Sequence, residues 1–175
     1  EQLAARHEFI DINKVGIFGH SGGGFMSTAA MLVYPDFFKV AVSSAGNHDN
    51  AIYNSWWSES HHGIEKKLDQ EGNVEYEYEI DNNQELAKNL KGHLLLVTGD
   101  MDNNVHPAAT MRVVDALIKE NKRFSFMILP GQRHGFGTMS EYFFWLKADY
   151  FSKHLLGKND FSIDMNIINQ DIPQN

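Results

Sequence analysis

The chain has 175 residues, of which 42% are hydrophobic and 12% aromatic, enough to bury the core of one domain. Its formal net charge is −8 and its lysines and arginines form no extended cluster, which argues against a nucleic-acid partner. It contains no cysteine, which excludes disulfides, and no run of about 18 apolar residues that would span a membrane.

The first third of the chain predicts two strands joined by a helix. Residues 2–11 have the apolar spacing of the end of an amphipathic helix, and residues 15–18 are a short β-prone run. Helix-forming residues begin after Ser21 and continue to Tyr34, where the following proline disfavours helix. A short β-branched run over residues 38–44 then predicts a second, buried strand.

Residues 51–82 are the least regular part of the chain. They contain an aromatic patch with Trp56 and Trp57, and a stretch over 74–80 that alternates with period two. We interpret the segment as an excursion between core elements that is partly extended or helical.

The second half of the chain alternates between helix and strand. The predicted elements are a helix over 83–90 capped by Asn82 or Asn83, strands over 93–99 and 124–129, and helices over 108–121 and 139–155. Such alternation predicts a parallel sheet covered by helices on both faces, the α/β class. We expect one domain over residues 1–156 and an Asn/Asp-rich tail over 157–175.

A tight turn carries a candidate nucleophile. Gly19-His20-Ser21-Gly22-Gly23 lies between a predicted strand and a predicted helix and matches the G-x-S-x-G elbow, in which the serine occupies a strained backbone position. A helix-capping serine is the alternative, but the strand–turn–helix context favours a nucleophile. The Gly22 N–H, at the start of the helix, is the first candidate oxyanion donor.

Two further strand-end loops supply an acid and a base. Asp102 follows the third predicted strand and His134 the fourth, and the carboxyl ends of parallel strands meet at one edge of the sheet. The chain order Ser…Asp…His is that of α/β-hydrolases. We expect His134 to take the proton of Ser21 and Asp102 to orient the imidazole, with Asp100 as the rival carboxylate.

Other histidines and a tryptophan carry less specific signals. His48-Asp49 and His61-His62 suggest metal ligands, but no third ligand stands at a recognised spacing, so we expect no metal and no other cofactor. Trp57 either packs in the core or lines a substrate pocket near the site.

Four segments of the chain carry a family resemblance. They are Gly19-His20-Ser21-Gly22-Gly23-Gly24, Phe38-Lys39-Val40-Ala41-Val42-Ser43-Ser44-Ala45-Gly46, Thr98-Gly99-Asp100-Met101-Asp102-Asn103-Asn104-Val105-His106 and Arg133-His134-Gly135. They resemble the catalytic domain of the prolyl oligopeptidase family of serine peptidases, and its dipeptidyl peptidase IV branch in particular. The resemblance implies an α/β-hydrolase fold and a catalytic triad of Ser21, Asp102 and His134.

The resemblance also implies residues of the substrate pocket. Asn104 would bind a peptide carbonyl and Val105 would lie in the P1 pocket. Trp57 and Tyr53 would supply aromatic walls suited to proline or alanine. The dipeptidyl peptidase branch usually has a tyrosine directly after the nucleophile, where this chain has Gly22, so one wall of that pocket is absent.

The resemblance places further parts of the family's catalytic machinery upstream of Glu1. These are a second oxyanion donor, which is a tyrosine hydroxyl, and a β-propeller, so we expect this chain to be the C-terminal part of a larger peptidase. The family often pairs subunits through C-terminal elements, which implies a homodimer. Relatives of this composition are often exported bacterial enzymes, which implies the periplasm or secretion.

The sequence thus predicts a serine peptidase that hydrolyses short peptides after proline or alanine through an acyl-enzyme. A carboxylesterase on the same fold and a non-catalytic fragment are the alternatives. Because one oxyanion donor is worth about 3–4 kcal/mol, we expect this chain alone to turn substrate over weakly or not at all.

Overall fold

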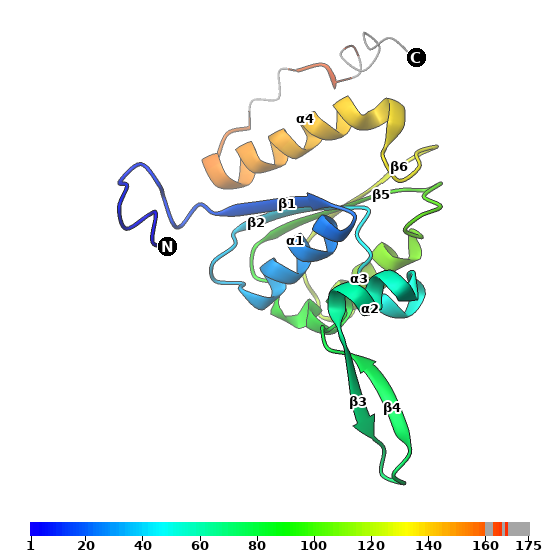
Figure 1. The fold of residues 1–175 in the computed structure, drawn as a ribbon. Helices are drawn as coiled ribbons and strands as arrows, with labels where there is room; N and C mark the ends of the chain where they lie inside the picture. Colours follow the sequence, from blue (N-terminus) through cyan, green and yellow to red (C-terminus); the bar gives the residue numbers. More distant parts are fainter. Residues whose placement is uncertain (160–162, 166, 168–175) are drawn as a thin grey trace.

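A parallel sheet of four strands forms the centre of the protein (Figure 1). The computed structural model describes residues 1–159, 163–165 and 167. The strands, in sheet order, are β1 (Gly16–His20), β2 (Val40–Ser44), β5 (His93–Gly99) and β6 (Ser125–Leu129). All four predicted strands are therefore confirmed, and with them the α/β class.

Helices cover both faces of this sheet. One face is covered by α1 (Gly22–Val33), α3 (Ala108–Lys119) and the 3₁₀ helix η2 (Asn83–Asn89), and the other by α4 (Ser140–Phe151) (Figure 1). The helix predicted over 83–90 is present, but it forms as a 3₁₀ helix. The Asn82 N–H that precedes it donates to Glu85 Oε2 at 3.0 Å.

The continuous apolar run of β5 is explained by this double cover. Leu96 belongs to a buried cluster with Met31 of α1 and Leu117 of α3. Its neighbour Val97 points to the opposite face and packs in a second cluster with aromatic side chains of α4. A strand that is buried on both faces has no polar side to alternate with.

The segment over 51–82 leaves the sheet and returns to it, as predicted. It contains the 3₁₀ helix η1 (Asn50–Ile52), the helix α2 (Ser55–His62) and an antiparallel hairpin of β3 (Ile64–Leu68) and β4 (Val74–Tyr78). The period-two alternation of the sequence corresponds to β4. The hairpin projects away from the body of the molecule (Figure 1).

The amphipathic helix predicted over residues 2–11 does not form. These residues make a series of turns, and the side chains of Leu3 and Phe9 are 62% and 84% exposed. A helix this short is marginal in water unless an apolar face packs against another element. The prediction was wrong because, in the described part of the structure, Leu3 and Phe9 stay exposed instead of packing against another element.

Two short helices flank α4 along the chain. The short 3₁₀ helix η3 (Gly137–Met139) leads into α4, and the π-helix η4 (Ser152–Leu156) follows it. Most of the tail predicted over 157–175 lies outside the described residues. Across the described ranges, none of the helices combines the length and the apolar character needed to cross a bilayer.

Candidate active site

The backbone at Ser21 has the strain typical of a nucleophile elbow. Ser21 has φ 57° and ψ −123° and directly precedes α1, and its N–H donates to the Ser44 carbonyl at 2.9 Å. A Cβ on Gly19 would lie 2.2 Å from the Gly23 carbonyl oxygen, so only glycine lets the strand and helix come this close. The turn presents Ser21 at the carboxyl end of β1. The N–H of Gly22, in the first turn of the helix, has no partner within the helix.

Asp102 is buried and held by three hydrogen bonds. Its side chain is 0% exposed, and its Oδ1 accepts from the backbone N–H groups of Asn104 and Val105, both at 2.9 Å. Its Oδ2 lies 2.8 Å from Nδ1 of His134. Because a carboxylate can only accept, Nδ1 carries the hydrogen of this bond, and in the neutral imidazole Nε2 is then the nitrogen with the lone pair. The rival carboxylate, Asp100, is exposed.

His134 lies beside the elbow through its contact with His20, the residue before Ser21. The two imidazole centroids are 4.8 Å apart. In the part of the chain that the structure describes, no hydrogen bond joins the Ser21 hydroxyl to His134. The structure therefore joins the predicted base and acid directly, and it brings the turn of the predicted nucleophile next to them.

His20 is a site residue that the sequence did not single out. Its Nδ1 lies 2.9 Å from the Ser44 hydroxyl oxygen, and its ring packs edge-on against Phe136 with centroids 5.2 Å apart. Burial lowers the pKa of His20, and the nearby His134 lowers it further. A second positive charge beside His134 is thereby disfavoured. The middle position of the G-x-S motif accepts any residue, so the motif gave no signal for this role.

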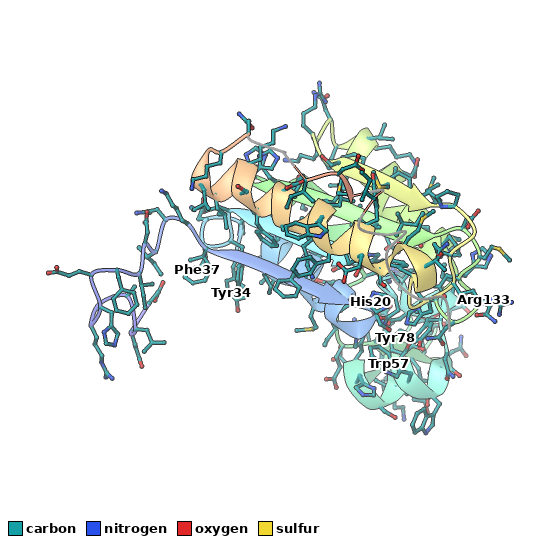
Figure 2. The ribbon with its side chains drawn as sticks, turned by 90° about the horizontal axis from the view of Figure 1, so that it is seen from above. His20, Tyr34, Phe37, Trp57, Tyr78 and Arg133 are labelled. Atoms are coloured by element: carbon teal, nitrogen blue, oxygen red, sulfur yellow. The ribbon has the colours of Figure 1, made fainter. Side chains whose placement is uncertain are left out.

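α2 brings the predicted aromatic wall to the elbow. A Cβ on Gly22 would lie 3.0 Å from Cζ2 of Trp57, so the indole occupies the space that a side chain at position 22 would take. The ring of Tyr53 packs edge-on against Trp57 at 5.5 Å, and the ring of His61 stacks on it at 4.3 Å. Figure 2 shows Trp57 and His20 at the same end of the molecule.

The other two predicted pocket residues follow Asp102 in the same loop. Val105 is buried, whereas Asn104 is exposed. The backbone N–H groups of both residues donate to the Asp102 carboxylate, which holds this part of the loop against it. The Asn104 side chain is therefore open to solvent, whereas the Val105 side chain is packed inside the protein.

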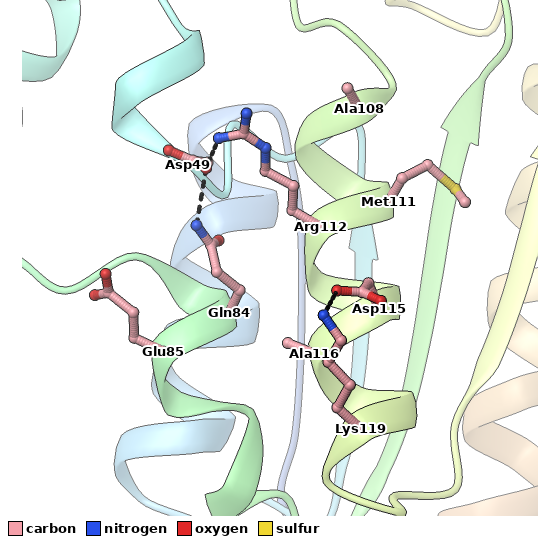
Figure 3. A pocket seen from close by; sticks show the side chains of 9 residues that line it. All are labelled: Asp49, Gln84, Glu85, Ala108, Met111, Arg112, Asp115, Ala116 and Lys119. Atoms are coloured by element: carbon pink, nitrogen blue, oxygen red, sulfur yellow. Dashed lines mark hydrogen bonds and ion pairs between the residues drawn. The ribbon is translucent and has the colours of Figure 1, made fainter.

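An ion pair anchors the loop that leads to the aromatic wall. Asp49, which follows β2, pairs with Arg112 of α3 and accepts from Nε2 of Gln84 at 2.8 Å (Figure 3). These three residues help to line a cavity of about 570 Å³ between η2 and α3, which none of the three predicted catalytic residues lines. The pair fixes the start of the segment that carries Tyr53 and Trp57.

The histidines that suggested metal ligands have other partners. His48 is fully buried, its Nδ1 accepts from Nδ2 of Asn83 at 2.8 Å, and burial lowers its pKa to about 3. Nδ1 of His62 lies 2.5 Å from Nδ2 of Asn50, and its ring packs on Phe25 with centroids 4.4 Å apart. Over the residues described, no three metal-ligating side chains come together.

Comparison with known sequences finds relatives among peptidases. The family model described as the prolyl oligopeptidase family matches residues 1–158. Human dipeptidyl peptidase 8 is 32% identical over 134 residues, which are 77% of this chain and 15% of that protein. Human prolyl endopeptidase FAP is 27% identical over 153 residues, which are 87% of this chain and 20% of that protein.

A solved structure shows the same architecture. The crystal structure of Porphyromonas gingivalis dipeptidyl peptidase 4 superposes with a TM-score of 0.73 and 26% sequence identity, over 88% of this chain and 21% of the other. The chain therefore spans about a fifth or less of the length of these three relatives. With its α/β-hydrolase fold and a family match over nearly its whole length, the chain belongs to the prolyl oligopeptidase family.

Proposed function

We propose that the protein is a serine peptidase that cleaves short peptides after proline or alanine through an acyl-enzyme. The observation that carries the proposal is the 2.8 Å contact between His134 Nδ1 and Asp102 Oδ2, in a loop that packs beside the strained elbow of Ser21. The names of the relatives, two dipeptidyl peptidases and a prolyl endopeptidase, support the substrate class.

The proposed reaction has two stages, acylation of Ser21 and hydrolysis of the acyl-enzyme. The Ser21 Oγ attacks the scissile carbonyl carbon while Nε2 of His134 takes the hydroxyl proton, and Asp102 stabilises the imidazolium that forms. Collapse of the tetrahedral intermediate breaks the C–N bond, and His134 gives its proton to the leaving amine. Water, activated by the same imidazole, then hydrolyses the acyl-serine ester.

The oxyanion of the intermediate needs donors that face it. Gly22 is in the first turn of α1, so its N–H has no intrahelical partner and lies at the positive end of the helix dipole. We propose it as one donor, with a second supplied by a part of the protein outside this chain. A missing donor costs about 3–4 kcal/mol of transition-state stabilisation, so this chain alone should be weakly active or inactive.

The proposed P1 pocket is small and aromatic. Trp57 lies against Gly22 and Tyr53 packs on Trp57, which supports a pocket wall next to the nucleophile. Val105 would close the pocket from the Asp102 loop, and the exposed Asn104 amide would bind a substrate carbonyl. A compact apolar ring such as that of proline suits walls of this kind.

The test is the hydrolysis of Gly-Pro and Ala-Pro chromogenic anilides by the natural full-length protein and its Ser21→Ala variant. We expect the substitution to abolish turnover, and an exposed-serine variant, Ser60→Ala, to retain it. Equal rates for Ser21→Ala and wild type would refute the proposal. A much higher kcat/KM for simple acyl esters than for prolyl amides would favour the carboxylesterase alternative.

A further inference from the structure

The β3–β4 hairpin has no packing partner for most of its surface. Its two strands pair only with each other in the described structure, and the hairpin projects from the body next to α2 (Figure 1). Tyr76 is 70% exposed and Leu68 is 67% exposed. An isolated two-stranded hairpin is at best marginally stable in water, so a formed hairpin of this kind calls for additional strands or a covering surface.

The turn of the hairpin is nevertheless held by a set of hydrogen bonds to Asp69. Oδ1 of Asp69 accepts from the backbone N–H groups of Glu71 and Asn73, both at 2.8 Å, and Nδ2 of Asn73 donates to Asp69 Oδ2 at 2.8 Å. Gly72 takes the positive φ of 85° that the turn requires. The register of the two strands is thereby fixed.

The fixed register separates the hairpin into an apolar face and a charged face. Ile64 pairs with Tyr78 and Leu68 pairs with Val74 on one face, with Lys66 opposite Tyr76 between them. The other face carries the charged residues, which are Glu65, Lys67, Glu75 and Glu77. On it Lys67 Nζ lies 2.6 Å from Glu77 Oε2.

The two free edges of the hairpin differ in what they can pair with. If two copies of β4 met antiparallel about Tyr76, Glu75 of each copy would face Glu77 of the other, and like charges directly opposite are destabilising. If two copies of β3 met antiparallel about Lys66, Glu65 of each would face Lys67 of the other. On the face that carries the charged residues, the β3 edge is therefore complementary to itself, whereas the β4 edge repels itself.

We propose that β3 is a self-association edge that pairs with β3 of a second copy of this chain. The pairing is antiparallel and centred on Lys66, so that Ile64 of one copy lies opposite Leu68 of the other and each Glu65 lies opposite a Lys67. The product is a four-stranded sheet in the order β4-β3-β3-β4. Its apolar side chains form one continuous face and its central charges alternate.

The one charge on the apolar face, Lys66, opposes this pairing. The two Lys66 side chains meet at the two-fold axis, and their long stems let both ammonium groups turn to solvent. The pair is a local cost that limits the strength of association. Replacing Lys66 by threonine, which favours strands, is expected to tighten the dimer.

Charge reversal on β3 tests the proposed register. Sedimentation velocity on the natural full-length protein gives the dimerisation constant for wild type, Glu65→Lys and Lys67→Glu. Each substitution puts like charges opposite each other twice in the dimer, so each should weaken association by about tenfold or more. Within the hairpin, Glu65→Lys removes the 3.6 Å ion pair with Lys67 but replaces the Glu65–Glu77 pairing of like charges by a lysine opposite Glu77.

Two further measurements should restore dimerisation and thereby make the test specific for the proposed register. The double variant Glu65→Lys/Lys67→Glu should dimerise again, and an equimolar mixture of the two single variants should form a heterodimer tighter than either homodimer. Glu71→Lys, in the turn and with the same charge change, should associate like wild type. A monomeric wild-type protein, or single variants that associate like wild type, overturns the proposal. So does a hairpin that is protected from hydrogen exchange in a monomer, because another part of the protein then covers it.

Discussion

His134 and Asp102 share a hydrogen bond of 2.8 Å, and the Asp102 carboxylate that accepts it is completely buried. The carboxylate is fixed from the other side by two backbone N–H groups of its own loop. The neutral imidazole is therefore held in one tautomer, which leaves Nε2 available as the proposed base. Each side chain comes from a different strand end, so the pairing depends on the assembled sheet.

Asp102→Asn should lower kcat by about four orders of magnitude, because an amide can donate to Nδ1 and hold the wrong tautomer of His134. Steady-state kinetics on the full-length protein with a prolyl anilide measure the effect, and we expect KM to change little. The matched control is Asp100→Asn, in the same loop but exposed, which should stay within about twofold of wild type. If both variants lose activity equally, the orienting carboxylate has been misassigned.

His20→Ala should reduce kcat by about ten- to a hundredfold without a matching rise in KM. The imidazole of His20 packs on that of His134, and a displacement of about 1 Å at a catalytic group costs up to about a hundredfold. His20→Phe keeps a ring against His134 and Phe136 and should recover most of the loss. Equal loss in the alanine and phenylalanine variants would show that the hydrogen bond to Ser44, rather than ring packing, does the positioning.

Gly22→Ala should lower kcat/KM for prolyl substrates by about tenfold, because the new methyl group lies 3.0 Å from Cζ2 of Trp57 and overpacking costs roughly 1–3 kcal/mol. The same substitution in a Trp57→Ala background should have an effect smaller than about twofold. This double-mutant cycle isolates the contact between the two residues. Additive effects in the two backgrounds would mean that Trp57 does not line the site next to Gly22.

His48 should make the protein less stable in acid. Burial lowers its pKa from 6.5 to about 3, so below pH 6.5 the unfolded chain binds a proton that the folded chain does not. The contribution of neutral His48 to the free energy of unfolding is therefore fully present above pH 6.5. It falls by up to about 1.4 kcal/mol per pH unit as the pH drops toward the folded-state pKa. Urea unfolding at pH 7 and pH 5 should show a smaller difference for His48→Gln than for wild type.

The matched control for His48 is His7→Gln, an exposed histidine in the N-terminal turns, whose removal should leave the pH dependence unchanged. The hydrogen bond of His48 explains why its protonation should destabilise the fold. Its Nδ1 accepts from the Asn83 amide, and a protonated Nδ1 would instead place one donor against another. An unchanged slope for His48→Gln would assign the acid sensitivity to other groups.

The core of the fold was predictable because its signals are local. The apolar run of β5 needs no partner to be recognised, and the elbow combines a strand, a glycine turn and a helix within a few residues of Ser21. The Ser–Asp–His order could be read from the sequence for the same reason, since each residue follows its own strand. The sequence could not predict which side chains of different loops contact each other, such as His20 with His134.

Three features depend on packing and were therefore missed or wrong. Residues 2–11 are periodic, but within the described residues their side chains Leu3 and Phe9 remain exposed. Strand β3 was not predicted because Lys66 interrupts its apolar face and only the β4 partner reveals the pattern. The role of His20 depends on His134, which a distant loop brings to it.

The central claim is that Ser21 is a nucleophile activated by His134. The most direct measurement treats the natural full-length protein with a fluorophosphonate probe and locates the adduct by peptide mass spectrometry. We predict a single adduct on Ser21, absent in Ser21→Ala and formed at least about a hundredfold more slowly in His134→Ala. An adduct on another residue, or labelling of Ser21 at an unchanged rate in His134→Ala, would contradict the account.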